Sequence, residues 1–331
     1  MSQAERTMEK PIVATMIGDP GGVGPEVAVK ALATGLPSQT SRPLLIGSVA
    51  AVERAIGYCG LGLRARPIAA VAEAAFQADV VDVLDPGLLA PHEVTVGQPS
   101  AAAGRAVRKW LDLSTRLAER GDVDAWIMAP IDRASLKLGV GMTDDDEAGP
   151  PGTFLLRTSG KLRVVPMSEH ISILDVPATI TRERVLALVC LVHETLERWG
   201  LRGPRIALAG LNPHARGNEE RNAIGPAAQT ARERGINVEG PISPDAVFRQ
   251  CFEGRYDVVV SMYHDQGQIA LKTTAFEGAC SIYIGLPYVH LTVPHGSAMD
   301  IAGRGVAQHA GMLAAMTTAA ALAAGRFTMK G

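Results

Sequence analysis

Several residue types and patterns are scarce in this chain of 331 residues, and each scarcity excludes a class of protein. Four cysteines without a CxxC pair argue against a disulfide framework or a zinc knuckle and fit a reducing cytoplasm. A formal net charge of −2 leaves no basic excess to neutralise phosphates, so we expect no nucleic-acid partner. The polar N-terminus lacks a signal-peptide core and no apolar run could span a bilayer, so we expect no membrane partner.

The common nucleotide-binding fingerprints are also absent. The segment "GDPGGVGPE" (18–26) joins a strand to a helix, but it lacks the Lys-Ser/Thr pair of a P-loop and does not fit GxGxxG. It is either a tight turn that needs positive φ or a backbone that approaches a ligand near Asp19 and Glu26. The small residues of "PHGSAMDIAGRGVAQ" (294–308) could admit an adenosine or pyrophosphate, with Asp300 accepting from a ribose hydroxyl; a plain loop is the alternative.

What the chain does contain is an alternation of apolar runs and helical patterns. Apolar residues make up 47% of the sequence, and Ala, Gly and Val are plentiful. The alternation predicts an α/β protein with mostly parallel sheets covered by helices on both faces, and the length favours two domains. We expect strands at 11–19, 43–48, 124–130, 162–167, 205–211, 256–263 and 279–287, and helices at 24–32, 49–60, 101–123, 182–200 and 312–325, with a loop at 143–153.

Polar clusters follow three of the predicted strands. Gly18-Asp19, Asn212-Pro213-His214 and His264-Asp265-Gln266 each come directly after an apolar run. In open parallel sheets, ligands bind outside the carboxyl ends of the strands. The three clusters therefore predict one ligand-binding cleft.

Three of the eight histidines are candidate metal ligands. His214 and His264 end strand-like runs, and His170 follows the strand at 162–167. Three neutral imidazoles are a recurrent catalytic metal set with an open position for substrate, but ordinary hydrogen-bonded or surface histidines would give the same spacing. Lys272, eight residues after His264, is either an exposed lysine or a group that orients a carboxylate or relays a proton.

Four motifs together resemble the 4-hydroxythreonine-4-phosphate dehydrogenase family. They are "GDPGGVGPE", "NPHARGN", "MYHDQGQIALK" and "HGSAMDIAGRG", and they span nearly the whole chain in the family's order. The resemblance implies NAD-linked oxidation of an alcohol followed by decarboxylation of a small-molecule substrate. It also implies a homodimer with the active site in an interdomain cleft near the interface, and two α/β/α domains like those of isocitrate and isopropylmalate dehydrogenases. We expect the first domain at 1–135 and 302–331 and the second, with the metal ligands and cofactor loop, at 136–301.

The resemblance also implies roles for individual residues. A divalent cation, zinc in the first place, would be held by His170, His214 and His264, with Lys272 contacting substrate. Asp265 would hold the neighbouring imidazole in the correct tautomer. The remaining implied contacts are to substrate from Thr153, Ser281 and His290, and to NAD from His295, Gly296, Ser297, Asp300 and Gly303.

Departures from the family pattern suggest a particular substrate. Gly152 stands where the biosynthetic members carry a histidine, Ser281 where they carry an asparagine, and His290 where they carry an arginine. Arginine is the natural bidentate phosphate clamp, so its absence argues against a phosphorylated substrate. These features resemble the terephthalate 1,2-cis-dihydrodiol dehydrogenase branch, which implies oxidation of the dihydrodiol to protocatechuate, with His290 facing the second carboxylate of the ring.

Three alternatives remain. The first is a dehydrogenase of 4-hydroxythreonine 4-phosphate or a related phosphorylated hydroxy acid. The second is a catalytically inactive binding protein descended from the family, which the intact His170, His214, His264 and Lys272 disfavour. The third is an acyl- or phosphotransferase on a similar scaffold, which only an analogy of fold supports.

Overall fold

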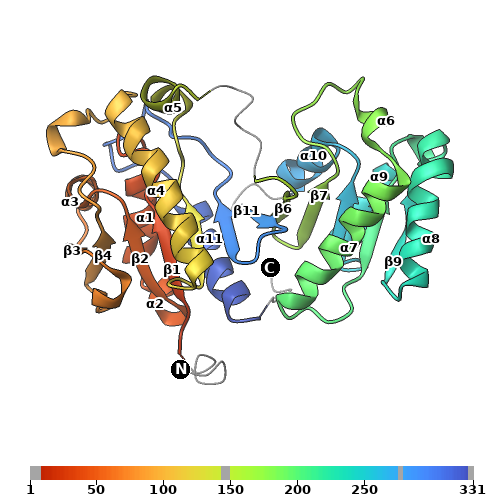
Figure 1. Cartoon of the computed structure of the whole chain (residues 1–331), viewed down its shortest axis with the longest axis horizontal. Helices are drawn as coiled ribbons and strands as arrows, with labels where there is room; N and C mark the ends of the chain where they lie inside the picture. Colours follow the sequence, from red (N-terminus) through yellow and green to blue (C-terminus); the bar gives the residue numbers. More distant parts are fainter. Residues whose placement is uncertain (1–8, 143–149, 275–278, 327–331) are drawn as a thin grey trace. The chain divides into compact units, whose positions relative to one another are not determined.

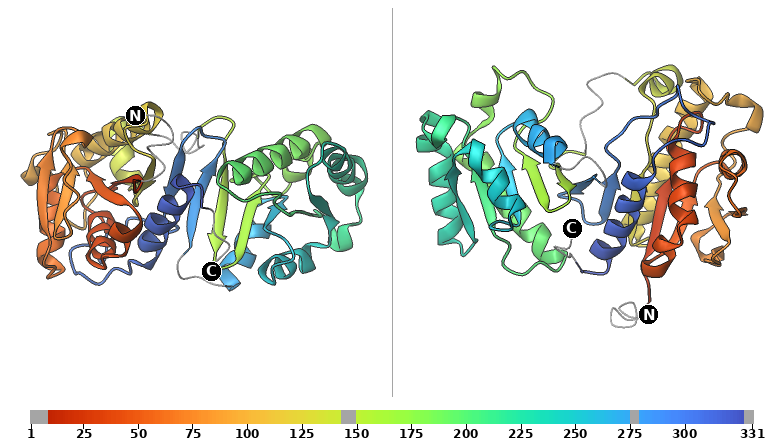
Figure 2. Two further views of the ribbon diagram at one scale, coloured as in Figure 1. Left: turned by 90° about the horizontal axis from the view of Figure 1, so that it is seen from below. Right: turned by 180° about the vertical axis from the view of Figure 1, so that it is seen from behind.

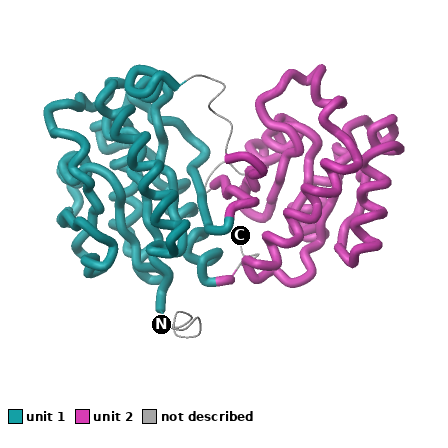
Figure 3. Tube along the Cα trace, in the orientation of Figure 1, with its two compact units in different colours: residues 1–149, 287–324 teal, residues 150–286, 325–331 magenta. Residues whose placement is uncertain are grey.

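The computed structural model describes residues 9–142, 150–274 and 279–326, and the chain divides into two compact units (Figure 3). Unit 1 contains residues 1–149 and 287–324, and unit 2 contains residues 150–286 and 325–331. The predicted boundaries, after residues 135 and 301, differ from this division. Helix α5 (Arg133–Val140) packs on α4 (Ala101–Arg120), and β12 (Val289–Thr292) pairs with β5 (Ala125–Met128), so these segments belong to unit 1.

The sheet of unit 1 is parallel, with the strand order β3-β4-β2-β1-β5-β12 (Figure 1). Its central strand β1 is buried at four of five positions, as expected for a parallel strand covered on both faces. From β1 the chain passes to its neighbour β2, then to the edge strand β3, and then back to β4, which lies between β2 and β3, before it crosses to β5 on the other side of β1. The remaining strand bounds are β1 Ile12–Met16, β2 Arg42–Ile46, β3 Arg64–Ile68 and β4 Val80–Leu84.

Helices cover both faces of this sheet. Helix α4 packs on β1 and β5 from one face, and α11 (Ala310–Ala323) packs on the same strands from the other, together with α1 (Gly24–Ala33) (Figure 2). Helix α4 begins where the Ser100 hydroxyl accepts from the Ala103 amide and ends at Gly121, which takes the left-handed conformation. The other helices of unit 1 are α2 Leu36–Thr40 and α3 Val49–Tyr58.

The sheet of unit 2 is mixed, with the order β11-β6-β7-β10-β8-β9. Strands β7, β10, β8 and β9 are parallel, whereas β6 runs antiparallel to both β7 and β11. The run at β10 is a buried β-branched segment typical of a parallel strand interior. The strand bounds are β6 Phe154–Ser159, β7 Leu162–Pro166, β8 Ile206–Ala209, β9 Val238–Ile242, β10 Val258–Ser261 and β11 Cys280–Ile284.

Helices also lie on both faces of the second sheet. Helices α9 and α10 bury an apolar cluster against β7, β8 and β10, and α7 lies on the opposite face (Figure 2). The α-helix bounds are α6 Val176–Thr179, α7 Arg182–Arg198, α8 Gly225–Glu233, α9 Pro244–Phe252 and α10 His264–Thr274. A one-turn 3-10 helix, η5, covers Pro213–Ala215, and a π-helical turn, η6, covers Glu220–Ile224.

The predicted α/β fold class is confirmed, and each predicted strand and helix is present with bounds shifted by a few residues. Five strands were not predicted from the sequence: β3, β4, β6, β9 and β12. Of the predicted loop at 143–153, residues 143–149 lie outside the described residues. None of the helices described here has the length and apolar character needed to cross a membrane.

Candidate functional site

The site in unit 2 begins at the carboxyl ends of two neighbouring parallel strands, β7 and β10. Backbone pairing continues past the strands, because the amide of Met167 donates to the carbonyl of Ser261 (2.8 Å). The hydroxyl of Ser168 then donates to the carbonyl of Met262 (3.1 Å). These bonds bring the segment after β7 beside the first residue of α10, His264.

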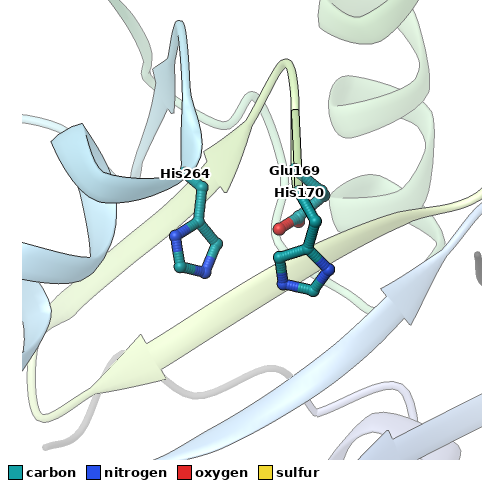
Figure 4. Close-up of side chains that lie close together, drawn as sticks. All are labelled: Glu169, His170 and His264. Atoms are coloured by element: carbon teal, nitrogen blue, oxygen red, sulfur yellow. The ribbon is translucent and has the colours of Figure 1, made fainter. Parts of the chain in front are cut away.

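Three side chains that can bind a metal meet at this point: Glu169, His170 and His264 (Figure 4). One ligand atom from each lies within 4.8 Å of the others. The two imidazole rings have centroids 5.3 Å apart and are tilted by 55°. Imidazoles with a carboxylate are a donor set that zinc commonly takes, so the residues present fit a divalent cation.

His264 has its ring orientation fixed by its neighbour. Nδ1 of His264 lies 2.7 Å from Oδ1 of Asp265. A carboxylate can only accept, so Nδ1 carries the proton and Nε2 is the nitrogen left for a metal. The catalytic role of Asp265 stays a prediction.

The next two residues of the HDQG motif hold the site together. Gln266 accepts from the Met262 amide (2.7 Å) and donates to the Gly210 carbonyl (2.9 Å), so it ties the end of β10 to the end of β8. A Cβ on Gly267 would lie 2.6 Å from a methyl group of Val164. Glycine at this position therefore lets α10 pack closely against β7.

An ion pair that sequence reasoning missed adjoins the site. Arg157, on β6, donates from both terminal nitrogens to Glu169, at 2.7 and 2.9 Å. Arg157 is only 8% exposed, so the carboxylate is the charge partner that its burial requires. An arginine inside the apolar run "FLLRTS" is the signal that could have pointed to such a partner.

His214 lies outside this group of three among the described residues. It is an exposed residue of η5 with a φ of 55°. The loop is anchored by Asn212, whose backbone amide and side chain donate to Glu220 (2.7 and 2.8 Å). Burial raises the pKa of Glu220, but hydrogen bonds from Asn212 and from nearby backbone amides together outweigh burial, so the pKa is lowered. Metal ligation by His214 stays a prediction.

A cavity of about 350 Å³ surrounds the group. It is lined by Glu169, His170, Ile171, Ile173, Val176, Tyr263, His264 and Asp265. Lys272 is an exposed residue of the same helix as His264, α10, and the helical rise places its Cα roughly 12 Å further along the axis. Contact of Lys272 with substrate stays a prediction.

Two of the predicted substrate residues belong to unit 2. Ser281, on β11, lies directly opposite Arg157 of β6 in the antiparallel register and is buried. Thr153 precedes β6 and donates its hydroxyl to the Pro150 carbonyl (2.5 Å). Gly152 has a φ of 77°, so it forms a left-handed turn in front of the strand. Ser281 therefore adjoins the ion pair of Arg157, whereas Thr153 caps a turn.

His290 belongs to unit 1 and is buried in its sheet. Its ring stacks on Trp126, with centroids 3.7 Å apart and an angle of 12° between the planes. Burial lowers the pKa of His290 to about 3. The imidazole is therefore uncharged at neutral pH and offers no positive charge to a carboxylate.

The predicted cofactor loop also belongs to unit 1, where Ser297 fixes it to the N-caps of two helices. Its hydroxyl donates to Oδ2 of Asp132 (2.9 Å), the N-cap of α5, and its carbonyl accepts from the amide of Val23 (2.9 Å), the N-cap of α1. Gly296 and Asp300 are exposed. Nε2 of His295 is buried with no hydrogen-bond partner among the described residues. Exposed groups and an unsatisfied nitrogen fit a polar ligand at this loop.

The glycine-rich segment 18–26 packs against that loop. A Cβ on Gly22 would lie 2.8 Å from the Ser297 carbonyl, and one on Gly18 would lie 2.1 Å from the Pro130 carbonyl. Gly18 has a φ of 73°, so the turn does need positive φ there. Glu26 is buried and accepts from the Ala307 amide (2.7 Å). These close approaches are to the protein's own backbone, so a tight turn accounts for these glycines.

Comparisons with known proteins point to one family. The family described as "Pyridoxal phosphate biosynthetic protein PdxA" matches residues 39–319. A relative from Novosphingobium aromaticivorans named "Putative 4-hydroxythreonine-4-phosphate dehydrogenase" is 46% identical over 96% of each chain. The D-threonate 4-phosphate dehydrogenase of Cupriavidus necator is 37% identical over 96% of this chain and 98% of its own. The crystal structure of a Klebsiella pneumoniae 4-hydroxythreonine-4-phosphate dehydrogenase has a TM-score of 0.85, at 33% identity, over 95% of this chain and 99% of its own.

These relatives correct the predicted substrate. The terephthalate 1,2-cis-dihydrodiol dehydrogenase of Burkholderia xenovorans is more distant, with 29% identity and a TM-score of 0.68 over 94% of this chain and 98% of its own. The prediction of terephthalate catabolism was therefore wrong. It rested on three positions, whereas the similarity to enzymes named for phosphorylated substrates extends along nearly the whole chain. The expected contact between His290 and a second ring carboxylate required that substrate, so it is withdrawn as well.

Proposed function

Because the chain belongs to the PdxA family, we propose that it is a metal-dependent, NAD-linked dehydrogenase of a 4-phosphorylated hydroxy acid. The substrate class is that of 4-hydroxythreonine 4-phosphate and D-threonate 4-phosphate, the compounds for which its relatives are named. The observation that carries the proposal is the group formed by His170 and His264 beside Glu169 at the carboxyl ends of β7 and β10.

The metal would be held by His170 and His264. A divalent cation at this point supplies Lewis acidity, which lowers the pKa of a bound hydroxyl and favours loss of its proton. Asp265 would hold His264 in the tautomer that leaves Nε2 free to bind the cation. Ile171, Ile173 and Val176 give the same cavity an apolar part of its lining.

The reaction itself is a hydride transfer followed by loss of CO₂. The hydroxyl carbon β to the carboxylate gives a hydride to NAD⁺, and its hydroxyl gives up a proton. The resulting β-keto acid breaks its bond to the carboxyl carbon, and the electron pair left behind takes up a proton. Lys272 would orient the carboxylate or donate that proton.

The cofactor would bind at residues 295–303 of unit 1. Asp300 is exposed and can accept from a ribose hydroxyl, while Gly296 leaves space for close approach. Ser297 acts indirectly, because its hydroxyl and carbonyl are already engaged with Asp132 and Val23. His295 offers Nε2 to a polar group of the ligand.

Absorbance of NADH tests this function. Purified protein with NAD⁺ and zinc is assayed with 4-hydroxythreonine 4-phosphate, with D-threonate 4-phosphate, and with both compounds lacking the phosphate. We expect NADH with at least one phosphorylated compound, and removal of the phosphate should lower the catalytic efficiency about 100-fold or more, because remote binding energy is lost. Equal rates with and without the phosphate would contradict the proposed substrate class, and no NADH from any of them would contradict the activity.

A further inference from the structure

We propose that Glu169 is a ligand of the metal together with His170 and His264, and that Arg157 is the positioning residue that holds its carboxylate in place. The proposal rests on the metal dependence of the proposed function and adds a charged ligand to it. Neither residue belongs to the set of ligands implied by sequence resemblance, which contains histidines alone. The inference comes from the side chains that meet at the ends of β7 and β10.

The geometry allows ligation with small movements. Ligands at a tetrahedral zinc lie about 3.3 Å apart, because the metal–ligand bonds are about 2.0–2.2 Å long. The ligand atoms of Glu169, His170 and His264 lie within 4.8 Å of one another. His170 is exposed and Glu169 is half-buried, so rotation of these side chains can close the remaining distance. Imidazoles together with a carboxylate form a recurrent donor set of catalytic zinc.

Arg157 leaves the carboxylate able to bind a cation. Its two nitrogens use one lone pair on each oxygen of Glu169, and a carboxylate offers about four such sites. Carboxylates that bind metals are themselves hydrogen-bonded by residues behind them, which fixes their orientation. Arg157 is anchored in β6, opposite Ser281 of β11, so the guanidinium is held by the sheet rather than by a loop.

The alternative is an ion pair with a purely structural role. The side chain of Glu169 remains 31% exposed, and it lines the same cavity as His170 and His264. A structural pair has no need to face that cavity. The two interpretations also differ in one measurable property, because only ligation makes the affinity for metal depend on Glu169.

The test measures metal affinity rather than activity. Zinc is removed from the full-length protein with a chelator, and rebinding is followed by competition with a chromophoric chelator and by the metal-induced rise in Tm. We expect Glu169→Gln and His170→Asn each to weaken zinc binding by about 100-fold or more, because loss of a ligand should cost more than the roughly 10- to 100-fold that loss of a residue behind a ligand costs. Arg157→Lys, which keeps the charge but loses the bidentate contact, should weaken it about 10-fold. Glu183→Gln, an exposed carboxylate of α7, is the matched control and should change nothing.

Two further results decide the proposal. Cobalt absorption reports the ligand set directly, so the visible spectrum of the cobalt-loaded protein should change in Glu169→Gln and not in Glu183→Gln. If Glu169→Gln fails to fold, Glu169→Asp replaces it, because a shortened carboxylate should also weaken binding.

Wild-type affinity and spectrum in the Glu169 variants would overturn the inference while leaving a dehydrogenase activity intact. Glu169-dependent metal binding without any NADH formation would instead reject the proposed function alone.

Discussion

At the scale of single residues, burial fixes the protonation state of His290 in unit 1. The ring is stacked on Trp126, and its Nδ1 lies 3.3 Å from the Trp126 carbonyl. Loss of hydration disfavours the charged imidazolium, and the pKa falls to about 3. In the unfolded chain, histidine titrates near 6.5, so the unfolded state binds a proton between pH 3 and 6.5 that the folded state does not.

His290 should therefore make stability depend on pH. The free energy of unfolding should fall as pH decreases from about 6.5 toward 3, by at most about 1.4 kcal/mol per pH unit from this residue. In His290→Phe, which keeps a ring against Trp126, that contribution should vanish. Urea unfolding at pH 7, 5 and 4 measures it, with the exposed His92→Gln as control. An unchanged dependence on pH in His290→Phe would show that the ring is not buried as a neutral group.

Residues of the site differ in how far the sequence reveals them. His170 and His264 could be chosen because polar residues directly after buried strands gather at one edge of a parallel sheet. The arginine within the run at 154–159 indicates only that Arg157 needs a charge partner, and Glu169 could not be chosen as that partner because the pairing depends on the antiparallel hairpin of β6 and β7. The uncharged state of His290 could not be predicted either, because it depends on packing against Trp126, which is distant in the sequence.

At the scale of elements, two segments nearly 280 residues apart pack on each other in unit 1. Lys30 of α1 donates to the carbonyls of Gly305 and Ala307 (2.6 and 2.8 Å), beside the bond from Ala307 to Glu26. Gly24 begins α1, and a Cβ there would lie 2.1 Å from the Ile17 carbonyl, so glycine lets the helix start directly against the backbone that follows β1. The turn before α1 therefore depends on glycine, and α1 in turn holds the segment at 305–307 through Lys30 and Glu26.

Substitution of Gly24 tests this packing. Gly24→Ala should lower the free energy of unfolding by roughly 2 kcal/mol or more, since the methyl group meets backbone that cannot move aside. Gly57 is the matched control, because it is an exposed helical glycine of α3 with open space around it. Gly57→Ala should stabilise by up to about 1 kcal/mol. Chemical denaturation measures both, and an unchanged stability in Gly24→Ala would contradict the close approach.

The predictability of elements follows burial. Strands such as β10 are continuous runs of buried β-branched residues and are evident in the sequence. Strand β3 lies at the edge of its sheet with two arginines and a proline, and β9 contains a glycine and a proline, so neither shows the expected pattern. Strand β6 is only half-buried and carries Arg157, which disguises it. Edge strands and antiparallel strands of a mixed sheet therefore cannot be predicted from continuous apolar runs.

At the scale of the whole molecule, exposed apolar side chains lie beside the cavity at His170 and His264. Ile171, Ile173 and Leu174 are exposed by 43, 60 and 85% in the loop between β7 and α6. Ile269, on α10, is also exposed. Contiguous exposed apolar residues commonly mark a protein–protein interface. The predicted homodimer would cover such a surface and would place the active site near the interface.

We expect Leu174→Asp to shift the protein toward the monomer, because a charge would be buried at the interface. Sedimentation equilibrium at several protein concentrations measures the association constant. Leu138→Asp, which changes an exposed leucine of unit 1, should leave the association unchanged. A Leu174→Asp protein that dimerises as tightly as the wild type would exclude this loop from the interface.

Turnover with and without divalent ions shows whether the enzyme needs a cation at His170 and His264. The rate of NADH formation from the preferred phosphorylated hydroxy acid is recorded for the protein as purified, after removal of divalent ions, and after zinc is restored. We expect the rate to disappear on removal and to return with zinc, but not to return in His264→Asn. Undiminished turnover by the stripped protein would contradict a catalytic cation at this site.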